Sequence, residues 1–137
     1  MSGGWDGEWH LRLARPDDAA GMVALGGGGP MALPARGGHS LVAHCGGALA
    51  GMLLASTRRR TLHIERVHVR PDRRGRGIGA GLVRACLVDA ANTGFRSVTA
   101  TVCPAVPDGA LFYGRFGFVR EDGRADDLVL VLGNAGE

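Results

Sequence analysis

Apolar and polar residues recur along the chain with the spacings of strands and helices. Alternation over residues 9–14 predicts a first strand, and apolar residues at Ala19, Met22, Val23 and Leu25 predict a short helix after it. A longer helix is expected over residues 77–92, where Ile78, Leu82 and Cys86 share a face, and a third over residues 108–116. Further strands are expected over residues 40–45, 48–56, 62–69, 97–103, 118–121 and 128–132.

Glycine, proline and acidic residues mark where these elements begin and end. An acidic residue, Asp17 or Asp18, is placed to cap the first helix, Gly46 and Gly47 join two strands into a hairpin, and Gly94 follows the long helix. Residues 57–61 are expected to form a basic turn, and an acidic turn should join the last two strands. Residues 26–38 contain four consecutive glycines and two prolines, so we expect a mobile loop with at most one helical turn.

The resulting order is strand, helix, loop, three strands, helix, strand, helix and two strands. This order predicts an α/β protein with one mixed, mostly antiparallel sheet and helices on both faces. A length of 137 residues suits a single domain, 1–137. The ends, at about 1–8 and 133–137, are expected to be flexible.

The composition indicates where in the cell the protein is expected and in which redox state its cysteines are. No apolar run approaches the roughly 20 residues of a membrane span, and the polar residues 1–10 do not resemble a secretory signal. We therefore expect a cytoplasmic protein that does not enter a membrane. Cys45, Cys86 and Cys103 lack the spacing of a metal site, so we expect no metal and mostly buried, reduced thiols. Cys103, near the end of a predicted strand, could also be reactive, although core packing is the favoured interpretation.

The positive charge is carried by arginine alone, since the chain has no lysine, and the formal net charge is +3. Half of the 16 arginines lie between residues 58 and 76, where Glu65 and Asp72 are the only acidic residues. Such a cluster indicates an anionic partner or a solvated face. Nucleic acid is the less favoured partner, because aromatic residues make up only 5% of the chain and do not interleave with the arginines.

A glycine-rich turn over residues 70–81, RPDRRGRGIGAG, lies between a predicted strand and the long helix. Glycines let backbone N–H groups converge without an intervening Cβ, and the helix N-terminus adds unpaired donors and partial positive charge. The turn is therefore suited to bind phosphate, unless it is only a loop in a chain with 24 glycines. The lack of lysine excludes a Walker loop, and Ala80 stands where a dinucleotide fingerprint needs its last glycine.

The spacing Arg74-x-x-Gly77-x-Gly79, with the apolar strand before it, resembles the signature of the GNAT superfamily of N-acetyltransferases over residues 64–82. The resemblance implies a sheet splayed between the strands at 62–69 and 97–103, and acetyl-CoA as co-substrate. It implies that the turn holds the pyrophosphate of coenzyme A and that the strand backbone pairs with the pantetheine amides. The implied cofactor-binding residues are Val67, His68, Val69, Arg74, Gly75, Arg76, Gly77, Ile78, Gly79 and Ala80.

Tyr113, the only tyrosine, resembles the tyrosine of the family's Tyr-x-x-x-Gly-Phe motif, which ends here at Phe118. The resemblance implies that Tyr113 lies near the coenzyme sulfur and protonates the leaving thiolate. The alternative is a packing role beside Phe112 and Phe116. One departure concerns Val106, because family members often carry asparagine at this place, seven residues before the tyrosine.

The base is expected from His63 and Glu65, which lie two residues apart on a strand and so share a face. Related enzymes carry glutamate or histidine at these spacings before the arginine that corresponds to Arg74. Histidine, with an ordinary pKa of about 6.5, suits the deprotonation of an amine at neutral pH. The alternative is that Glu65 pairs with an arginine and that His63 is a structural residue at a strand edge. His39, His44 and His68 have no better claim.

These features predict transfer of an acetyl group from acetyl-CoA to a primary amine by direct attack in a ternary complex. The acceptor would be a small-molecule amine or a peptide N-terminus. Two alternatives remain. One is a coenzyme-A-binding module that is regulatory or catalytically degenerate, which Val106 and the absence of the family's usual second helix in residues 26–38 favour. The other is an arginine-rich nucleic-acid binder. Open sheet edges in this fold also allow a homodimer.

Overall fold

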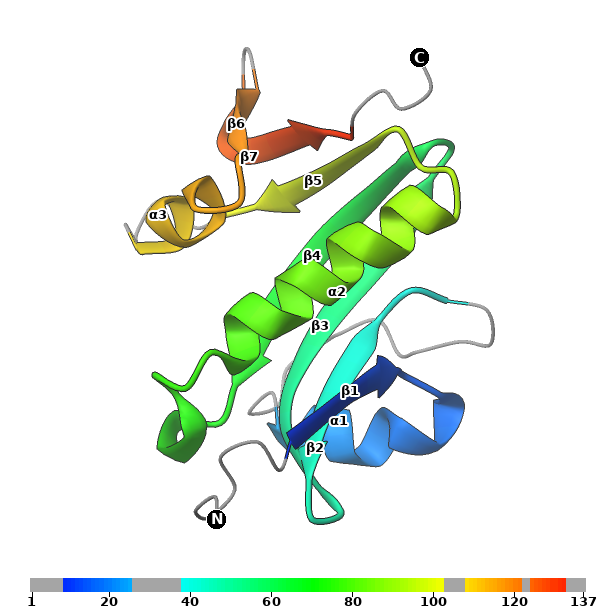
Figure 1. Ribbon diagram of the computed structural model, residues 1–137, viewed down its shortest axis with the longest axis vertical. Helices are drawn as coiled ribbons and strands as arrows, with labels where there is room; N and C mark the ends of the chain where they lie inside the picture. Colours follow the sequence, from blue (N-terminus) through cyan, green and yellow to red (C-terminus); the bar gives the residue numbers. More distant parts are fainter. Residues whose placement is uncertain (1–8, 26–37, 103–107, 122–123, 133–137) are drawn as a thin grey trace.

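The computed structural model describes residues 9–25, 38–102, 108–121 and 124–132 (Figure 1). Within these ranges the helices and strands follow the predicted order. They are β1 (Trp9–Leu13), the 3₁₀ turn η1 (Pro16–Asp18), α1 (Ala19–Leu25), β2 (Leu41–Cys45), β3 (Ala48–Arg58), β4 (Thr61–Val69), the 3₁₀ turn η2 (Pro71–Arg73), α2 (Ile78–Asn92), β5 (Ser97–Thr101), α3 (Asp108–Gly114), β6 (Val119–Glu121) and β7 (Arg124–Val131).

The strands form a single seven-stranded sheet in the order β1-β2-β3-β4-β5-β7-β6. Only β4 and β5 are parallel neighbours, and each of the other adjacent pairs is antiparallel. The connection between β4 and β5 is made by α2, as a parallel pair requires a crossover. The expected α/β architecture with a mixed, mostly antiparallel sheet is confirmed.

Both faces of the sheet are covered by helices because the strands alternate. On β3, Leu53 faces the cluster formed with α2, whereas Met52 and Leu54 face the cluster that contains Met22 of α1. The α2 side is the larger core and receives Leu82 and other buried residues of that helix. Figure 1 shows α2 running across β3 and β4, so the start of this helix lies close to the end of β4.

The two central strands separate along their length. Register pairs between β4 and β5 run from Thr61 with Ser97 to Ile64 with Ala100. Beyond Ile64, β4 continues to Val69 and pairs with β3 alone within the described part of the chain. Figure 1 shows the resulting opening between β4 and β5, with α3 at the end of β5. The splay that the family resemblance implies is therefore present.

A β-bulge changes the phase of β4 at Glu65. Leu54 pairs with Arg66, whereas the next residue of β3, Ala55, pairs with Ile64, so Glu65 is the extra residue. Leu62 and Ile64 are buried against α2, and Val67 and Val69 pack against the same cluster. Arg66 and His68 therefore lie on the face of β4 that points away from α2. Without the bulge, simple alternation would place them on the same face as Ile64, toward α2.

Several predicted boundaries are corrected by pairing. The basic turn predicted over residues 57–61 is shorter, because Thr57 pairs with Leu62 and Arg58 with Thr61, which leaves only Arg59 and Arg60 in the turn. Arg59 adopts a left-handed φ of 56° to close it. β7 begins at Arg124 rather than at residue 128, because Arg124 pairs with Glu121 of β6.

Other elements end earlier than predicted. β1 ends at Leu13 and β5 ends at Thr101. α3 ends at Gly114 because Phe116 and Gly117 donate to carbonyls three residues earlier instead of continuing the helix. The expected loop over 26–38, apart from its last residue, and the expected flexible ends at 1–8 and 133–137 lie outside the described residues.

Candidate active site

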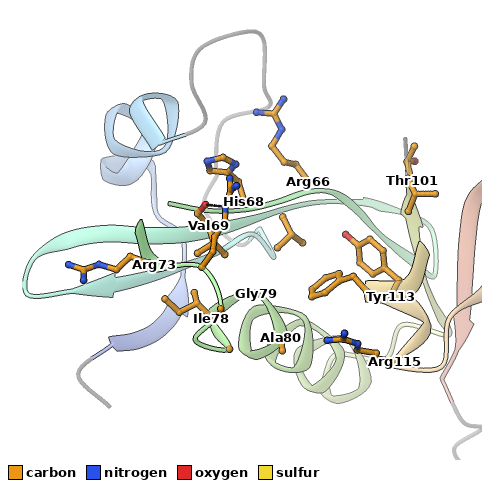
Figure 2. Close-up of a pocket in the computed structure, with 16 residues that line it drawn as sticks. Arg66, His68, Val69, Arg73, Ile78, Gly79, Ala80, Thr101, Tyr113 and Arg115 are labelled. Atoms are coloured by element: carbon orange, nitrogen blue, oxygen red, sulfur yellow. Dashed lines mark hydrogen bonds between the residues drawn. The ribbon is translucent and has the colours of Figure 1, made fainter. Parts of the chain in front are cut away.

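A pocket of about 680 Å³ opens where β4 and β5 part, and the start of α2 and the end of α3 close its sides (Figure 2). Its lining combines an exposed strand, a glycine-rich turn, two aromatic side chains and several arginines. The lining residues are Arg66, Val67, His68, Val69, Arg73, Arg74, Gly75, Gly77, Ile78, Gly79, Ala80, Thr101, Val102, Phe112, Tyr113 and Arg115.

The glycine-rich turn presents backbone rather than side chains to this pocket. Gly75 and Gly77 have left-handed φ values of 80° and 85°, and a Cβ built on either would meet no atom within 4 Å. Gly77 is the N-cap of α2, and its carbonyl accepts the first helical hydrogen bond, from the N–H of Gly81 at 2.9 Å. The N–H groups of Ile78, Gly79 and Ala80 consequently have no carbonyl partner within the helix. This arrangement suits the binding of phosphate oxygens.

The end of β4 lines the pocket beside this turn. Val67, His68 and Val69 pair with β3 on one edge and border the pocket on the other. Arg74 stabilises the junction, since its Nε donates a hydrogen bond of 3.0 Å to the Val69 carbonyl oxygen. All predicted cofactor-binding residues except Arg76 line the pocket, and Arg76 is an exposed residue of the same turn.

Tyr113 reaches the pocket from α3, and in Figure 2 its hydroxyl end points toward β4. The side chain is only 6% exposed and packs edge-on against Phe112 and Phe118, with ring centroids 5.1 and 5.3 Å away. Burial, with a smaller contribution from Cys86, raises the pKa of the Tyr113 hydroxyl above its ordinary value. The hydroxyl is therefore protonated at neutral pH and has a proton to donate.

His63 lies between two threonines of the neighbouring strand. Its Nδ1 is 2.6 Å from the Thr99 Oγ1 and its Nε2 is 3.1 Å from the Thr101 Oγ1. His63 does not line the pocket, but Thr101 does. The predicted base is thus one hydrogen bond away from the pocket wall.

Glu65, the other predicted base, also lies outside the pocket lining. It is exposed, and its Oε2 accepts a hydrogen bond of 2.6 Å from the Ser56 hydroxyl. Because Ser56 is the register partner of His63, this contact puts Glu65 on the His63 face of the sheet. The two residues do not contact each other through any hydrogen bond among the described residues.

His68 differs from His63 because it lines the pocket directly. Burial is the main cause that lowers its pKa, and the positive charges of Arg74 and Arg66 lower it further. A hydrogen bond with the backbone of Leu25 acts in the opposite direction. His68 is therefore uncharged at neutral pH.

The arginine cluster seen in the sequence is divided by the fold. Arg66, Arg73 and Arg74 line the pocket, whereas Arg58, Arg59 and Arg60 lie at the opposite end of β4. The cluster is consequently not one basic patch. This distribution gives no support to a nucleic-acid surface that spans residues 58–76.

Five pocket residues with polar or aromatic side chains were not among the predicted site residues: Arg66, Arg73, Thr101, Phe112 and Arg115. Phe112 and Arg115 flank Tyr113 in the chain, so the tyrosine motif itself was a signal for them. Thr101 carried no such signal, because its role depends on the parallel register of β5 against β4. Arg66 was counted in the charge cluster, but its face depends on the bulge at Glu65.

The free thiols agree with the sequence interpretation where they are described. Cys45 and Cys86 form no disulfide, and burial raises the pKa of the Cys86 thiol to about 12, so it stays protonated. Cys103 lies outside the described residues. In the part of the chain that the structure describes, no three histidine, cysteine or acidic side chains gather as a metal site would require. No described helix is long and apolar enough to cross a membrane.

Solved structures with the same fold cover nearly the whole chain. Ard1 from Thermoplasma volcanium superposes with a TM-score of 0.77 at 16% identity, covering 92% of this chain and 99% of Ard1. The ribosomal-protein-S18-alanine N-acetyltransferase from Escherichia coli gives a TM-score of 0.75 at 16% identity, covering 94% of this chain and 97% of that enzyme. Diaminobutyrate acetyltransferase EctA from Paenibacillus lautus was solved with its substrate L-2,4-diaminobutyric acid and coenzyme A. It superposes with a TM-score of 0.72 at 18% identity, covering 92% of this chain and 95% of EctA.

A search of curated proteins found no sequence that matches this chain. The model of the acetyltransferase (GNAT) family does match it, over residues 12–118, a range that holds the splayed strands, the glycine-rich turn and Tyr113. The family resemblance inferred from the turn is therefore confirmed, and the chain belongs to the GNAT family of acetyltransferases.

Proposed function

We propose that this protein transfers an acetyl group from acetyl-CoA to a primary amine by direct attack in a ternary complex. The observation that carries the proposal is the continuity of one pocket. The same pocket joins the glycine-rich turn, the open edge of β4 and the protonated hydroxyl of Tyr113. A phosphate site and a proton donor at two ends of one pocket suit a long, phosphorylated thioester.

The residues present fit coenzyme A. The N–H groups of Ile78, Gly79 and Ala80 would hold the pyrophosphate, with Arg73 and Arg74 supplying positive charge. The pocket lining contains four arginines and no aspartate or glutamate, so it suits a ligand with several negative charges. The open edge of β4 at Val67–Val69 would accept the pantetheine amides as an added strand.

Tyr113 and His63 are proposed to move the protons. The neutral amine forms a bond to the thioester carbonyl carbon, the carbon–sulfur bond breaks, and Tyr113 gives its proton to the departing sulfur. His63 takes the amine proton through Thr101: the Thr101 hydroxyl accepts from the amine while it donates its own proton to Nε2 of His63. A donor bond from Nδ1–H to Thr99 would leave Nε2 free for this step. Glu65 supports the base by its negative charge on the same face.

Solved proteins with this fold point to two kinds of acceptor. Among the solved relatives by fold, one is named for a ribosomal-protein alanine and another was solved with diaminobutyric acid. We therefore propose a small-molecule amine or a peptide N-terminus as acceptor. The sheet edges β1 and β6 leave room for a homodimer.

A coenzyme-A-binding module without turnover is the second candidate, and Val106 in place of the usual asparagine favours it. Val106 lies outside the described residues. The two functions are separated by following release of the coenzyme A thiol from acetyl-CoA with a panel of small amines and peptides. Amine-dependent release supports the enzyme. Tight coenzyme A binding without release for any amine would support the second candidate.

A further inference from the structure

Arg66 occupies a part of the pocket that the cofactor-binding turn does not reach. It is half-buried, it lines the pocket, and the bulge at Glu65 turns it to the face of β4 opposite α2. Figure 2 shows Arg66 and His68 rising from one side of the strand, while Ile78, Gly79 and Ala80 lie on the other side. The N–H groups of the turn and Arg66 thus lie on opposite sides of β4 and border different parts of one pocket.

No carboxylate in the described residues neutralises Arg66. The ion pairs there are Arg12 with Asp18, His39 with Asp89, and Arg70 with Asp72. The neighbouring Glu65 is held by the Ser56 hydroxyl instead.

The surroundings of Arg66 therefore favour an anion. A half-buried guanidinium that forms no ion pair has lost part of its hydration, and a bound anion compensates for that loss. Its positive charge already contributes to the lowered pKa of His68, so His68 brings no second cation to this side at neutral pH. A carboxylate is the natural partner because the planar guanidinium can bind both of its oxygens.

We propose that the acetyl acceptor carries a carboxylate and that Arg66 binds it. This inference rests on the proposed function. An amine must approach the thioester from the side that the cofactor does not fill, which is the side of Arg66. An acceptor with amine and carboxylate groups, such as an amino acid or an acidic peptide, satisfies Arg66 while the amine faces Thr101. Polyamines, which are cations only, are disfavoured by repulsion from Arg66.

The test compares matched pairs of acceptors: glycine, L-alanine, β-alanine and 4-aminobutyrate, each with its carboxamide. For the wild type, we expect kcat/KM to favour the acid of the best pair after correction for the fraction of neutral amine. Arg66→Gln should lower this acid-to-amide ratio by roughly tenfold to a hundredfold, the value of a hydrogen-bonded ion contact. Arg66→Lys should retain part of the ratio because it keeps the charge. Arg58→Gln, which removes an exposed arginine at the end of the neighbouring strand β3, away from the pocket, is the matched control.

Three outcomes would overturn the proposal. The first is an acid-to-amide ratio that is the same in the wild type and in Arg66→Gln. The second is weaker calorimetric binding of coenzyme A to Arg66→Gln with an unaltered ratio, which would assign Arg66 to the cofactor. If the wild type acetylates none of the probes, the proposed function fails for them, and thermal stabilisation of the coenzyme A complex by each acid and amide is measured instead. In that case the third contradicting outcome is that the acid and the amide of every pair stabilise the coenzyme A complex equally.

Discussion

Two arginine-rich turns lie at opposite ends of β4, and only one has the features of a binding site. The turn before β4 carries Arg59 and Arg60, with Arg58 beside it at the end of β3, and it closes a hairpin with Arg59 in a left-handed conformation. The turn after β4 carries Arg73 and Arg74, places glycines at the left-handed positions and leads into the N-terminus of α2. The two turns have similar charge and different backbones.

Arginines occur at both turns, but only the turn after β4 leads into a helix N-terminus, whose unpaired N–H groups suit phosphate oxygens. In the hairpin turn the Arg60 carbonyl accepts hydrogen bonds from the N–H groups of Arg96 and Ser97 at 2.7 and 3.4 Å, and the chain continues directly into β4. In the other turn the backbone donors at the start of α2 border an open pocket. Convergent backbone donors distinguish the second turn, which borders the pocket of about 680 Å³, from the hairpin turn, where Arg59 lines a separate pocket of about 390 Å³.

The largest effect is expected at the pocket end of β4, from Tyr113→Phe. Loss of the hydroxyl should lower kcat by roughly 100- to 10,000-fold while the affinity for acetyl-CoA changes little, because the proton is needed as the sulfur leaves. The ring remains, so packing against Phe112 and Phe118 is preserved. Steady-state kinetics with a good acceptor, together with calorimetry of coenzyme A, measures both quantities. A kcat equal to that of the wild type would make Tyr113 a packing residue.

The turn itself is tested by Gly79→Val. Gly79 has no left-handed φ, and a Cβ there would stand 3.6 Å from Phe112 and 3.7 Å from Val69, inside the pocket. The valine should weaken coenzyme A binding by about 100-fold, since it crowds at least two charge-assisted hydrogen bonds. Ala91→Val, on an exposed position of the same helix, is the control and should bind normally. Equal affinities in the two folded variants would contradict the site.

The path to His63 is tested by Thr101→Val, which removes one hydroxyl and keeps the shape. We expect kcat/KM to fall by at least about tenfold and the contribution of His63 to the pH–rate profile to disappear, as it should in His63→Ala. Thr101→Ser should restore both, because it returns the hydroxyl. If Thr101→Val and His63→Ala retain the wild-type profile, the amine loses its proton to solvent and the threonine only supports the strand.

The two turns can also be compared by removing one arginine from each. Arg74→Gln should weaken coenzyme A binding by about tenfold and reduce its dependence on salt, because one charge beside the phosphates is lost. Arg59→Gln should leave both quantities unaltered. Calorimetry at two salt concentrations gives the comparison. Equal losses in the two variants would mean that long-range charge, and not the turn, determines binding.

The smallest effect concerns stability. Arg59→Gly supplies the residue that tolerates φ near 56° and should raise the free energy of unfolding by up to about 1 kcal/mol. It also makes the hairpin turn resemble the other turn in composition. Coenzyme A affinity should nevertheless stay the same, because no helix N-terminus follows this turn. Chemical denaturation and calorimetry check the two halves of this prediction.

The parts of the molecule that the sequence predicts well depend on local signals. The β4–α2 turn could be found because its glycines, its arginines and the helix that follows are adjacent in the chain. The family motif around Tyr113 is local in the same sense, and it placed a hydroxyl at the pocket. The order of strands and helices also follows from periodicity within each segment.

The parts that the sequence did not predict depend on pairing between distant segments. Thr101 meets His63 only because β5 is parallel to β4 in one particular register. The face of Arg66 depends on a bulge that inserts Glu65, and an alternating pattern contains no sign of it. The length of the β3–β4 hairpin was underestimated because three consecutive arginines resemble a turn, although Arg58 still pairs with Thr61.

Amide hydrogen exchange with and without coenzyme A tests the comparison of the two turns most directly. We predict that coenzyme A slows exchange at residues 67–69 and 75–80, where the backbone borders the pocket, and leaves exchange at residues 58–61 unaltered. Arg59→Gln should show the same pattern, and Gly79→Val should lose it. Protection of residues 58–61, or no protection of residues 75–80 at saturating coenzyme A, would contradict a cofactor site at the β4–α2 turn.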